Sequence, residues 1–440
     1  MATTMIIDPR AFAKLLAICL FLAVVSTGAR AEETVSAPLE LTRAIEIATE
    51  DNPGLAQLQS RYLAMEEVPE QKGSLPDPQL SINAMNLPVG SFDLSQEAMT
   101  QMQLGFAQAF PFPGKRKLRK EASEFEAAAA RDDVEEARLQ LVRRVKWGWW
   151  QVYYLDRSLE IVESNLKLLR QFVEIAQTKY NVGDGLQQDV LLAQLELSRL
   201  LSQQIEIKNK RRVQAAQLNA LMGIAANRPV HLPSKMPTSL PSIASDGALY
   251  DLALDHRPLL ANARNNIAAA RSRLALANRD YYPDFKVGLN YGFRSGDNPP
   301  NIGGARDDLM SLMFSMSIPL YANTKQDRAV AQRSNELTMH HYSLQDAITN
   351  IQSAITDTSS EYLRAKEQFN LFRTGIVPQA RLTVDSMLSG YKVSRVDFLN
   401  LVRAQITLFN YEVQYWQALT EAKQALAQLE ASVGEENIYE

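Results

Sequence analysis

The chain has 440 residues, a formal net charge of −4 and a single cysteine. This acidic balance argues against nucleic-acid binding, which depends on a basic surface, and a lone cysteine excludes a disulfide framework. The chain holds only four histidines and no glycine-rich phosphate loop between a strand and a helix. We therefore expect no enzyme, no catalytic residue and no cofactor.

The first 31 residues predict a secretory signal peptide. Arg10 and Lys14 precede a short apolar run, and a small-residue cleavage site follows at 29–31. The apolar run is shorter than the about 20 residues of a spanning helix. It contains Cys19, so we expect a mature chain without thiol, disulfide or acyl group. The protein should be exported.

The same series of elements is expected twice, which indicates an internal duplication. Three pairs of segments match in order: 41–59 with 247–264, 75–85 with 282–293, and 103–115 with 311–325. A very long helix, a tight turn and a returning helix follow in each half. We divide the chain into the signal peptide (1–31) and two repeats (32–240 and 241–440), each ordered helix, strand, strand, long helix, turn, helix.

Two segments in each repeat alternate apolar with small or polar residues, which is the period-two pattern of a strand. In the clearest of them, Phe285, Val287 and Leu289 alternate with Lys286 and Gly288. The segments have about the length of tilted strands in a membrane barrel; a half-buried sheet on a helical domain is the alternative. Four strands cannot close such a barrel, and lipid does not tolerate an open edge. The chain should therefore pool its strands with copies of itself.

A basic stretch, PFPGKRKLRK, follows the second of these strands. We expect Lys115, Arg116 and Lys117 to lie near lipid phosphates at the inner face of the membrane. The alternative is an ordinary solvated helix start.

Long helices are expected over 115–180 and 327–391, which hold few prolines or glycines. About 65 residues at 1.5 Å each reach roughly 100 Å, far beyond the thickness of a bilayer. The last returning helix repeats apolar residues at coiled-coil spacing, for example Leu419, Ala422 and Leu426. These helices should cross the periplasm.

Each long helix ends at the same motif, Tyr-x-Val, and an Ala-Gln pair in the returning helix ends fourteen residues after the tyrosine. The motif residues are Tyr180, Val182 and Gln194 in the first repeat and Tyr391, Val393 and Gln405 in the second. Gly183 and its neighbours supply the flexibility for a tight reversal in the first copy. The second copy reverses without glycine.

Signal peptide, duplicated halves and paired Tyr-x-Val turns together resemble TolC-like outer membrane efflux proteins. The resemblance covers nearly the whole mature chain. It implies a homotrimer with a twelve-stranded β-barrel, four strands from each chain, continued by a long periplasmic α-helical barrel. It also implies a passive channel in the outer membrane that receives substrate from a periplasmic adaptor (a membrane fusion protein) and an inner-membrane pump.

The segment at 86–119, with its Pro-Phe-Pro-Gly-Lys element, resembles channels paired with heavy-metal pumps of the resistance-nodulation-division type. The cargo implied is copper and silver, or cobalt, zinc and cadmium. Drug export and type I protein secretion by the same kind of channel remain alternatives. A soluble periplasmic coiled-coil adaptor is a further alternative from a different class.

In the resembling family, an acidic residue often stands nine positions after the turn tyrosine, with another at twelve in the second half. Charged rings at a constriction select ions by field and geometry. Here the first half keeps Asp189, whereas the second has Asn400 and Arg403. Asp189–Arg403 and Asp184–Arg395 are candidate gate-closing ion pairs, and solvated helix-tip charges are the alternative.

Soft metal ligands occur in two places. Met85, Met99 and Met102 lie close together in sequence, and Met339 precedes two histidines on a long helix. Thioethers and imidazoles suit ions such as Cu(I). However, Met102 belongs to an apolar strand face, and adjacent helical residues point in different directions. We therefore predict no metal site.

Overall fold

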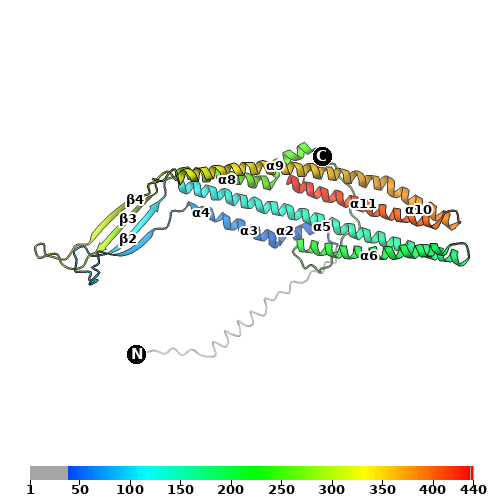
Figure 1. Ribbon diagram of the computed structural model, residues 1–440, viewed down its shortest axis with the longest axis horizontal. Coiled ribbons are helices and arrows are strands. Elements are labelled where there is room, and N and C mark those ends of the chain that lie inside the picture. The colour runs from blue at the N-terminus through cyan, green and yellow to red at the C-terminus, as the bar shows by residue number, and fades with distance from the viewer. Residues whose placement is uncertain (1–37, 437, 440) are drawn as a thin grey trace, which may run out of the picture.

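The computed structural model describes residues 38–436 and 438–439. The predicted signal peptide (1–31) lies outside the described residues. Figure 1 shows an elongated molecule with a sheet at one end and two helix reversals at the other. The long helices run side by side between these ends.

From residue 38 onward, the first half contains five helices and two strands: α2 (Leu41–Glu50), α3 (Pro53–Glu66), α4 (Val68–Gly73), β1 (Gln79–Met85), β2 (Gln101–Phe110), α5 (Lys115–Asn181) and α6 (Gln187–Leu221). The second half follows a similar order: α7 (Asp246–His256), α8 (Pro258–Arg279), β3 (Phe285–Phe293), β4 (Leu309–Met316), α9 (Gln326–Leu371), the π-helix η1 (Phe372–Ile376), α10 (Val377–Lys392) and α11 (Phe398–Val433).

Equivalent residues of the two halves take equivalent places. Pro53 and Pro258 are the first residues of α3 and α8, where proline's fixed φ and missing N–H suit the start of a helix. Ala48 and Ala253, aligned in the sequence, are both 1% exposed. A small side chain is needed at both places because α2, which carries Ala48, packs against α5, and α7, which carries Ala253, packs against α9.

The four strands form one antiparallel sheet in the order β1-β2-β3-β4. One row across the sheet joins Leu80, Phe106, Leu289 and Leu312. All four side chains are exposed; the first is 71% and the last 78% accessible. An apolar face of this extent, left open by the rest of the chain, is suited to contact with lipid rather than with water.

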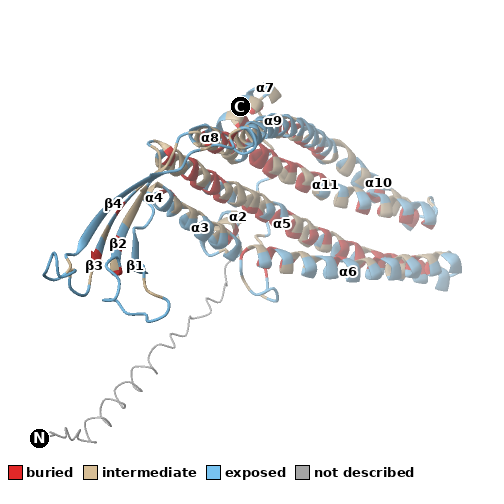
Figure 2. Ribbon diagram, turned by 60° about the vertical axis from the view of Figure 1, so that its left-hand side comes forward, coloured by how far each residue is buried: buried red, intermediate tan, exposed pale blue. Residues whose placement is uncertain are grey.

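The opposite face of the sheet carries polar and small side chains. The neighbouring row joins Ser81, Gly105, Asn290 and Ser311. A Cβ added at Gly105 would lie 2.2 Å from Asn290 Oδ1, so glycine makes room there for polar side chains. The predicted alternation is therefore present, with the apolar residues on the exposed outer face, and Figure 2 shows the strands as mostly exposed.

The first long helix, α5, runs for 67 residues without a break, which corresponds to roughly 100 Å. Its counterpart is interrupted by η1, just before Pro378. Proline has no N–H and its ring crowds the preceding turn. The chain widens there, and the Val377 N–H bonds to Phe372 O, five residues back.

Part of the core of the helical region lies along α5, and a further part lies between α9 and α11. Trp149 and Tyr153 are almost fully buried and stack with ring centroids 5.6 Å apart. The Trp149 indole N–H donates to Leu39 O at 2.9 Å, which ties the start of the described chain to the middle of α5. Within residues 38–436, no helix combines the length and the apolar character needed to cross a membrane.

Candidate functional site

The two helix reversals lie side by side at the end farthest from the sheet (Figure 1). Five residues connect α5 to α6 and five connect α10 to α11. Gly183 has a φ of +80° and Ser394, at the equivalent place, has a φ of +58°. The second turn therefore uses the same left-handed backbone as the first, with a serine where glycine is favoured.

Three side chains join the two turns, and we name them the tip clamp: Lys179, Asp184 and Ser394. The Lys179 Nζ donates to Ser394 Oγ at 2.6 Å, and the Ser394 hydroxyl donates to Asp184 Oδ2 at 3.2 Å. Lys179 also lies 3.5 Å from Asp184 Oδ2 and 5.0 Å from the ring centroid of Tyr391. This bridge explains why a serine occupies a backbone conformation that favours glycine, because glycine has no hydroxyl to form it.

Neither of the two expected ion pairs, Asp184–Arg395 and Asp189–Arg403, is present within the described residues of one protomer. Asp184 pairs with Lys179 rather than with Arg395, which is exposed. Arg403 lies with Asn400 on a groove between α10 and α11, and no ion pair to Asp189 is present among the described residues. Pairs of these side chains between protomers stay a prediction.

Asp189 faces a second carboxylate, which the sequence reasoning missed. Burial, and then the charge of Asp397, raise the pKa of Asp189. Asp397 directly precedes α11 at its N-cap, and an aspartate just before an apolar helix is the signal that could have drawn attention to it. Two carboxylates close together disfavour each other's ionised form, which is why the neighbouring charge adds to the effect of burial.

Tyr391, the turn tyrosine of the second repeat, is buried beneath the clamp. Its ring packs 5.2 Å from that of Phe398, and its hydroxyl has no hydrogen-bond partner in the described structure. Burial, followed by the charges of Asp189 and Asp184, raises the pKa of Tyr391 to about 12. Its counterpart Tyr180 is 43% exposed, so the two turn tyrosines are not equivalent.

The two Ala-Gln pairs also differ. Gln405 is buried, and its Nε2 donates to Asn165 Oδ1 at 2.6 Å. Asn165 in turn donates to Ile161 O at 2.9 Å, so α11 is joined to α5 by a buried polar contact. Gln194 is exposed on α6, while the preceding Ala193 is fully buried.

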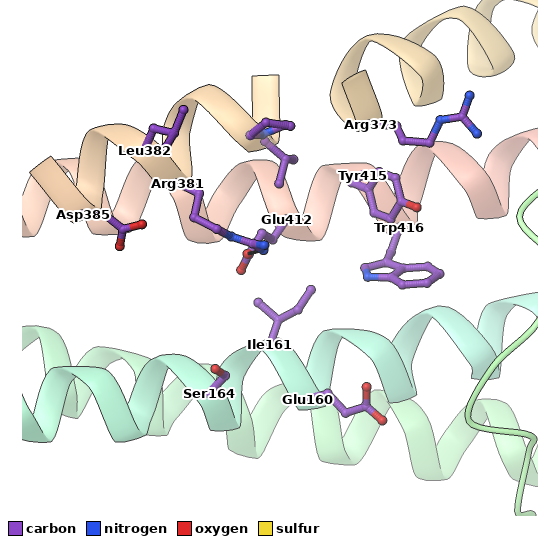
Figure 3. A pocket seen from close by; sticks show the side chains of 12 residues that line it. Glu160, Ile161, Ser164, Arg373, Arg381, Leu382, Asp385, Glu412, Tyr415 and Trp416 are labelled. Atoms are coloured by element: carbon purple, nitrogen blue, oxygen red, sulfur yellow. Dashed lines mark hydrogen bonds and ion pairs between the residues drawn. The ribbon is translucent and has the colours of Figure 1, made fainter. Parts of the chain in front are cut away.

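A groove of about 760 Å³ separates α5 from α10 and α11 (Figure 3). On one wall, Arg381 of α10 and Glu412 of α11 form an ion pair at 2.7 Å. Glu160 and Ile161 approach it from α5. The groove lies beside the buried core that α5 and α11 share between the sheet and the tip.

The basic stretch at the start of α5 divides between two roles. Lys115 is buried, and its Nζ lies 2.9 Å from Asp284 Oδ1, 3.3 Å from Asp280 Oδ1 and 3.0 Å from Tyr282 O. The prediction that Lys115 meets lipid phosphates is therefore wrong, because α8 and the start of β3 enclose it. Arg116 donates to Gly73 O at 2.8 Å, and Lys117 is exposed.

No cluster of three or more His, Cys, Asp or Glu side chains suited to a metal ion occurs among residues 38–436 and 438–439. Of the methionines considered as ligands, Met85 and Met102 lie on opposite faces of the sheet, since Met102 pairs with Phe293 on the apolar face and Met85 with Gln101. They do not converge.

Comparison with known proteins gives a consistent assignment of fold. The family model described as "Outer membrane efflux protein" matches residues 44–224 and again 249–435. The alkaline protease secretion protein AprF of Pseudomonas aeruginosa is 22% identical over 290 residues, which are 65% of this chain and 58% of AprF.

Solved structures share the fold over nearly the whole chain. The outer membrane protein VceC of Vibrio cholerae aligns with a TM-score of 0.76 and 20% identity, covering 90% of this chain and 96% of VceC. CusC, whose structures describe transmembrane channel formation, aligns with a TM-score of 0.69 and 16% identity, covering 91% and 93%. The predicted fold, strands of a membrane barrel continued by long helices, is confirmed.

Proposed function

Because the chain belongs to the outer membrane efflux protein family, we propose that it is the outer-membrane channel of a tripartite exporter. It extends from the outer membrane into the periplasm and is not an enzyme. It conducts its cargo passively from a periplasmic adaptor and an inner-membrane pump of the resistance-nodulation-division type to the exterior. The pump supplies the free energy.

The two-faced sheet with open edges is the observation that carries this proposal. The outer strands β1 and β4 each have a partner on one side only, and an unpaired edge is not tolerated in lipid. Three copies would supply twelve strands and close the barrel, with the Ser81–Ser311 row facing the lumen and the Leu80–Leu312 row facing lipid. The functional unit is then a homotrimer.

In this assembly the helix reversals would meet at the periplasmic mouth, and the tip clamp would hold them closed. Breaking the clamp in each of three protomers should favour the open state. A partly exposed charged hydrogen bond contributes about 1 kcal/mol. Three copies acting together therefore shift the closed–open equilibrium by roughly a hundredfold.

The test is the closed-state current of the purified protein in planar lipid bilayers. Lys179→Met removes the cation of the clamp and should raise that current strongly. Lys392→Met is the matched control, because it removes the same charge from the exposed last residue of α10, directly before the second turn. Equal currents in the two variants would contradict the clamp, and a protein without any channel current would contradict the function.

Arg403→Ala and Asp189→Asn test the ion pair predicted between protomers. Either substitution should raise the closed-state current if Asp189 of one protomer meets Arg403 of the next. Unchanged current in both variants would remove that pair from the gate and leave the clamp alone.

For the cargo, the resemblance of segment 86–119 supports heavy-metal cations, and the relative AprF, by its name, supports protein secretion. The two differ in phenotype. A deletion strain should become sensitive to copper and silver, or to cobalt, zinc and cadmium, if metals are exported. Loss of a secreted protease with unchanged metal tolerance would favour secretion.

A further inference from the structure

A groove of about 600 Å³ lies where the sheet meets the helices, between α4, the start of α5 and the adjoining ends of β2 and β3. One wall is aromatic and contains Phe110, Phe112 and Phe285. The other wall is cationic and contains Arg116, Lys117 and Lys120. The described residues that line this groove include no aspartate or glutamate.

The groove opens on the apolar side of the sheet. Phe110 and Phe285 are partners in the β2–β3 register, and by alternation they share a face with Phe106 and Leu289. That face is the one turned to lipid. Because β2 and β3 are the inner strands, one protomer forms the whole groove without help from a sheet edge.

The depth of the groove corresponds to the periplasmic surface of the membrane. It lies at the helical end of the strands, whereas the loops 86–100 and 294–308 lie at the other end (Figure 1). The ring of Tyr282 stacks on that of Phe112, with centroids 4.6 Å apart. Tyr321, which follows shortly after the end of β4, is 74% exposed. Aromatic side chains gather at this level in membrane barrels.

The three cations of the wall are not all neutralised by the protein. Lys120 pairs with Glu70 of α4. Arg116 uses its Nε on Gly73 O, which is an uncharged acceptor, and Lys117 is exposed. Asp280 and Asp284, which lie beside the start of α5, pair with the buried Lys115. An excess of positive charge therefore faces the lipid headgroups.

We propose that this groove is a binding site for an anionic phospholipid of the inner leaflet of the outer membrane. Arg116 and Lys117 bind the headgroup phosphate, and the acyl chains lie against Phe110 and Phe285. A basic pocket beside apolar walls is the chemistry that recognises such lipids. The proposal rests on the placement of the sheet in the outer membrane and not on the cargo or the gate.

The test uses the full protein in nanodiscs of phosphatidylcholine with a minor share of phosphatidylglycerol, and measures by native mass spectrometry which lipid stays bound. The wild type should retain phosphatidylglycerol selectively. Lys117→Gln should lower that retention about fivefold, which corresponds to about 1 kcal/mol for one lysine at a membrane surface. Lys325→Gln is the matched control, because Lys325 is an exposed lysine that directly precedes α9 in the second repeat and does not line the groove.

Three outcomes would overturn the site: retention without preference for the anionic lipid, equal loss in both variants, or displacement of the lipid by millimolar inorganic phosphate, which would indicate a site for free anions. Channel current in planar bilayers separates this proposal from the function. Lys117→Gln should conduct like the wild type. A failed lipid test would therefore contradict the lipid site but not the channel function, and an absent current would contradict the channel function but not the lipid site.

Discussion

Lys115 and Lys117 are two residues apart in a basic run and look alike in sequence, yet the structure gives them opposite roles. Lys115 is 3% exposed and contacts two carboxylates and a carbonyl oxygen between α5 and the start of β3. Lys117 is exposed at the lipid-facing groove. Substituting each by methionine keeps most of the side-chain volume and removes the charge.

The expected loss for Lys115→Met follows from these contacts. Removing one partner of a fully buried ion pair costs about 3–5 kcal/mol. Asp280 and Asp284 are 45% and 43% exposed, so water can replace the lost cation in part. The Phe112 N–H still donates to Asp284 at 2.8 Å. We therefore expect the free energy of unfolding to fall by about 1–3 kcal/mol for Lys115→Met and by less than about 0.5 kcal/mol for Lys117→Met.

The assay is guanidinium unfolding of the detergent-solubilised protein, followed by the fluorescence of the buried Trp149 and Trp150. Burial would by itself raise the pKa of Asp284, but the Phe112 N–H and the charge of Lys115 outweigh it and hold that pKa below its usual value. The stability due to this pairing is therefore present above about pH 4 and is lost as the pH falls through the lowered pKa. The difference between wild type and Lys115→Met should shrink in acid. Equal stability of the two variants at neutral pH would refute the assignment of Lys115 to the junction.

Gln405→Ala should lower the free energy of unfolding by about 1–3 kcal/mol, because it leaves Asn165 Oδ1 buried without a donor; Gln194→Ala, at the equivalent exposed position, is the control, and equal losses would contradict the reasoning. Ser394→Gly should be about 1 kcal/mol more stable than Ser394→Ala, since both lose the clamp hydroxyl but only glycine relieves the positive φ; identical melting of the two would exclude that strain. Tyr391→Phe should change stability at neutral pH by less than about 0.5 kcal/mol, because the hydroxyl has no partner. The pKa of Tyr391 is about 12 in the folded protein, against an ordinary value of 10. The stability that this difference supplies is fully present below pH 10 and is lost as the pH rises through 12. The variant should therefore be the more stable of the two in strong base.

The sequence predicted what depends on periodicity. The strands, the long helices and the two reversals follow from alternation, from the lack of helix breakers and from the repeated Tyr-x-Val motif, and all appear where expected. The interruption at η1 could have been suspected from Pro378, although nothing in the sequence says that the helix would widen rather than end.

Periodicity does not predict contacts between residues that are distant in sequence. The partners of Lys115 come from 165 and more residues away, and a basic run gives no sign of which member turns inward. The tip clamp pairs Lys179 with Ser394 across 215 residues. Neither residue stands at a position where the resembling family carries an acidic residue, so the sequence does not single it out. Alignment of the two repeats places Ser394 opposite Gly183, and a serine at a left-handed position was the available signal.

The two hairpins differ where they must meet one another rather than where each must fold. Inside each hairpin the equivalent positions match: the turn lengths are equal, and both third residues after the tyrosine have positive φ. Outside the hairpins, α3 and α8 both begin with proline. Between the hairpins the equivalence ends. Tyr391 is buried while Tyr180 is exposed, and Gln405 is buried while Gln194 is exposed. When two halves with the same order of elements lie side by side, each half has a different neighbour, so the side chains at the contact differ while the backbone path is shared. The exposed members, Tyr180 and Gln194, lie where the second hairpin does not cover the first.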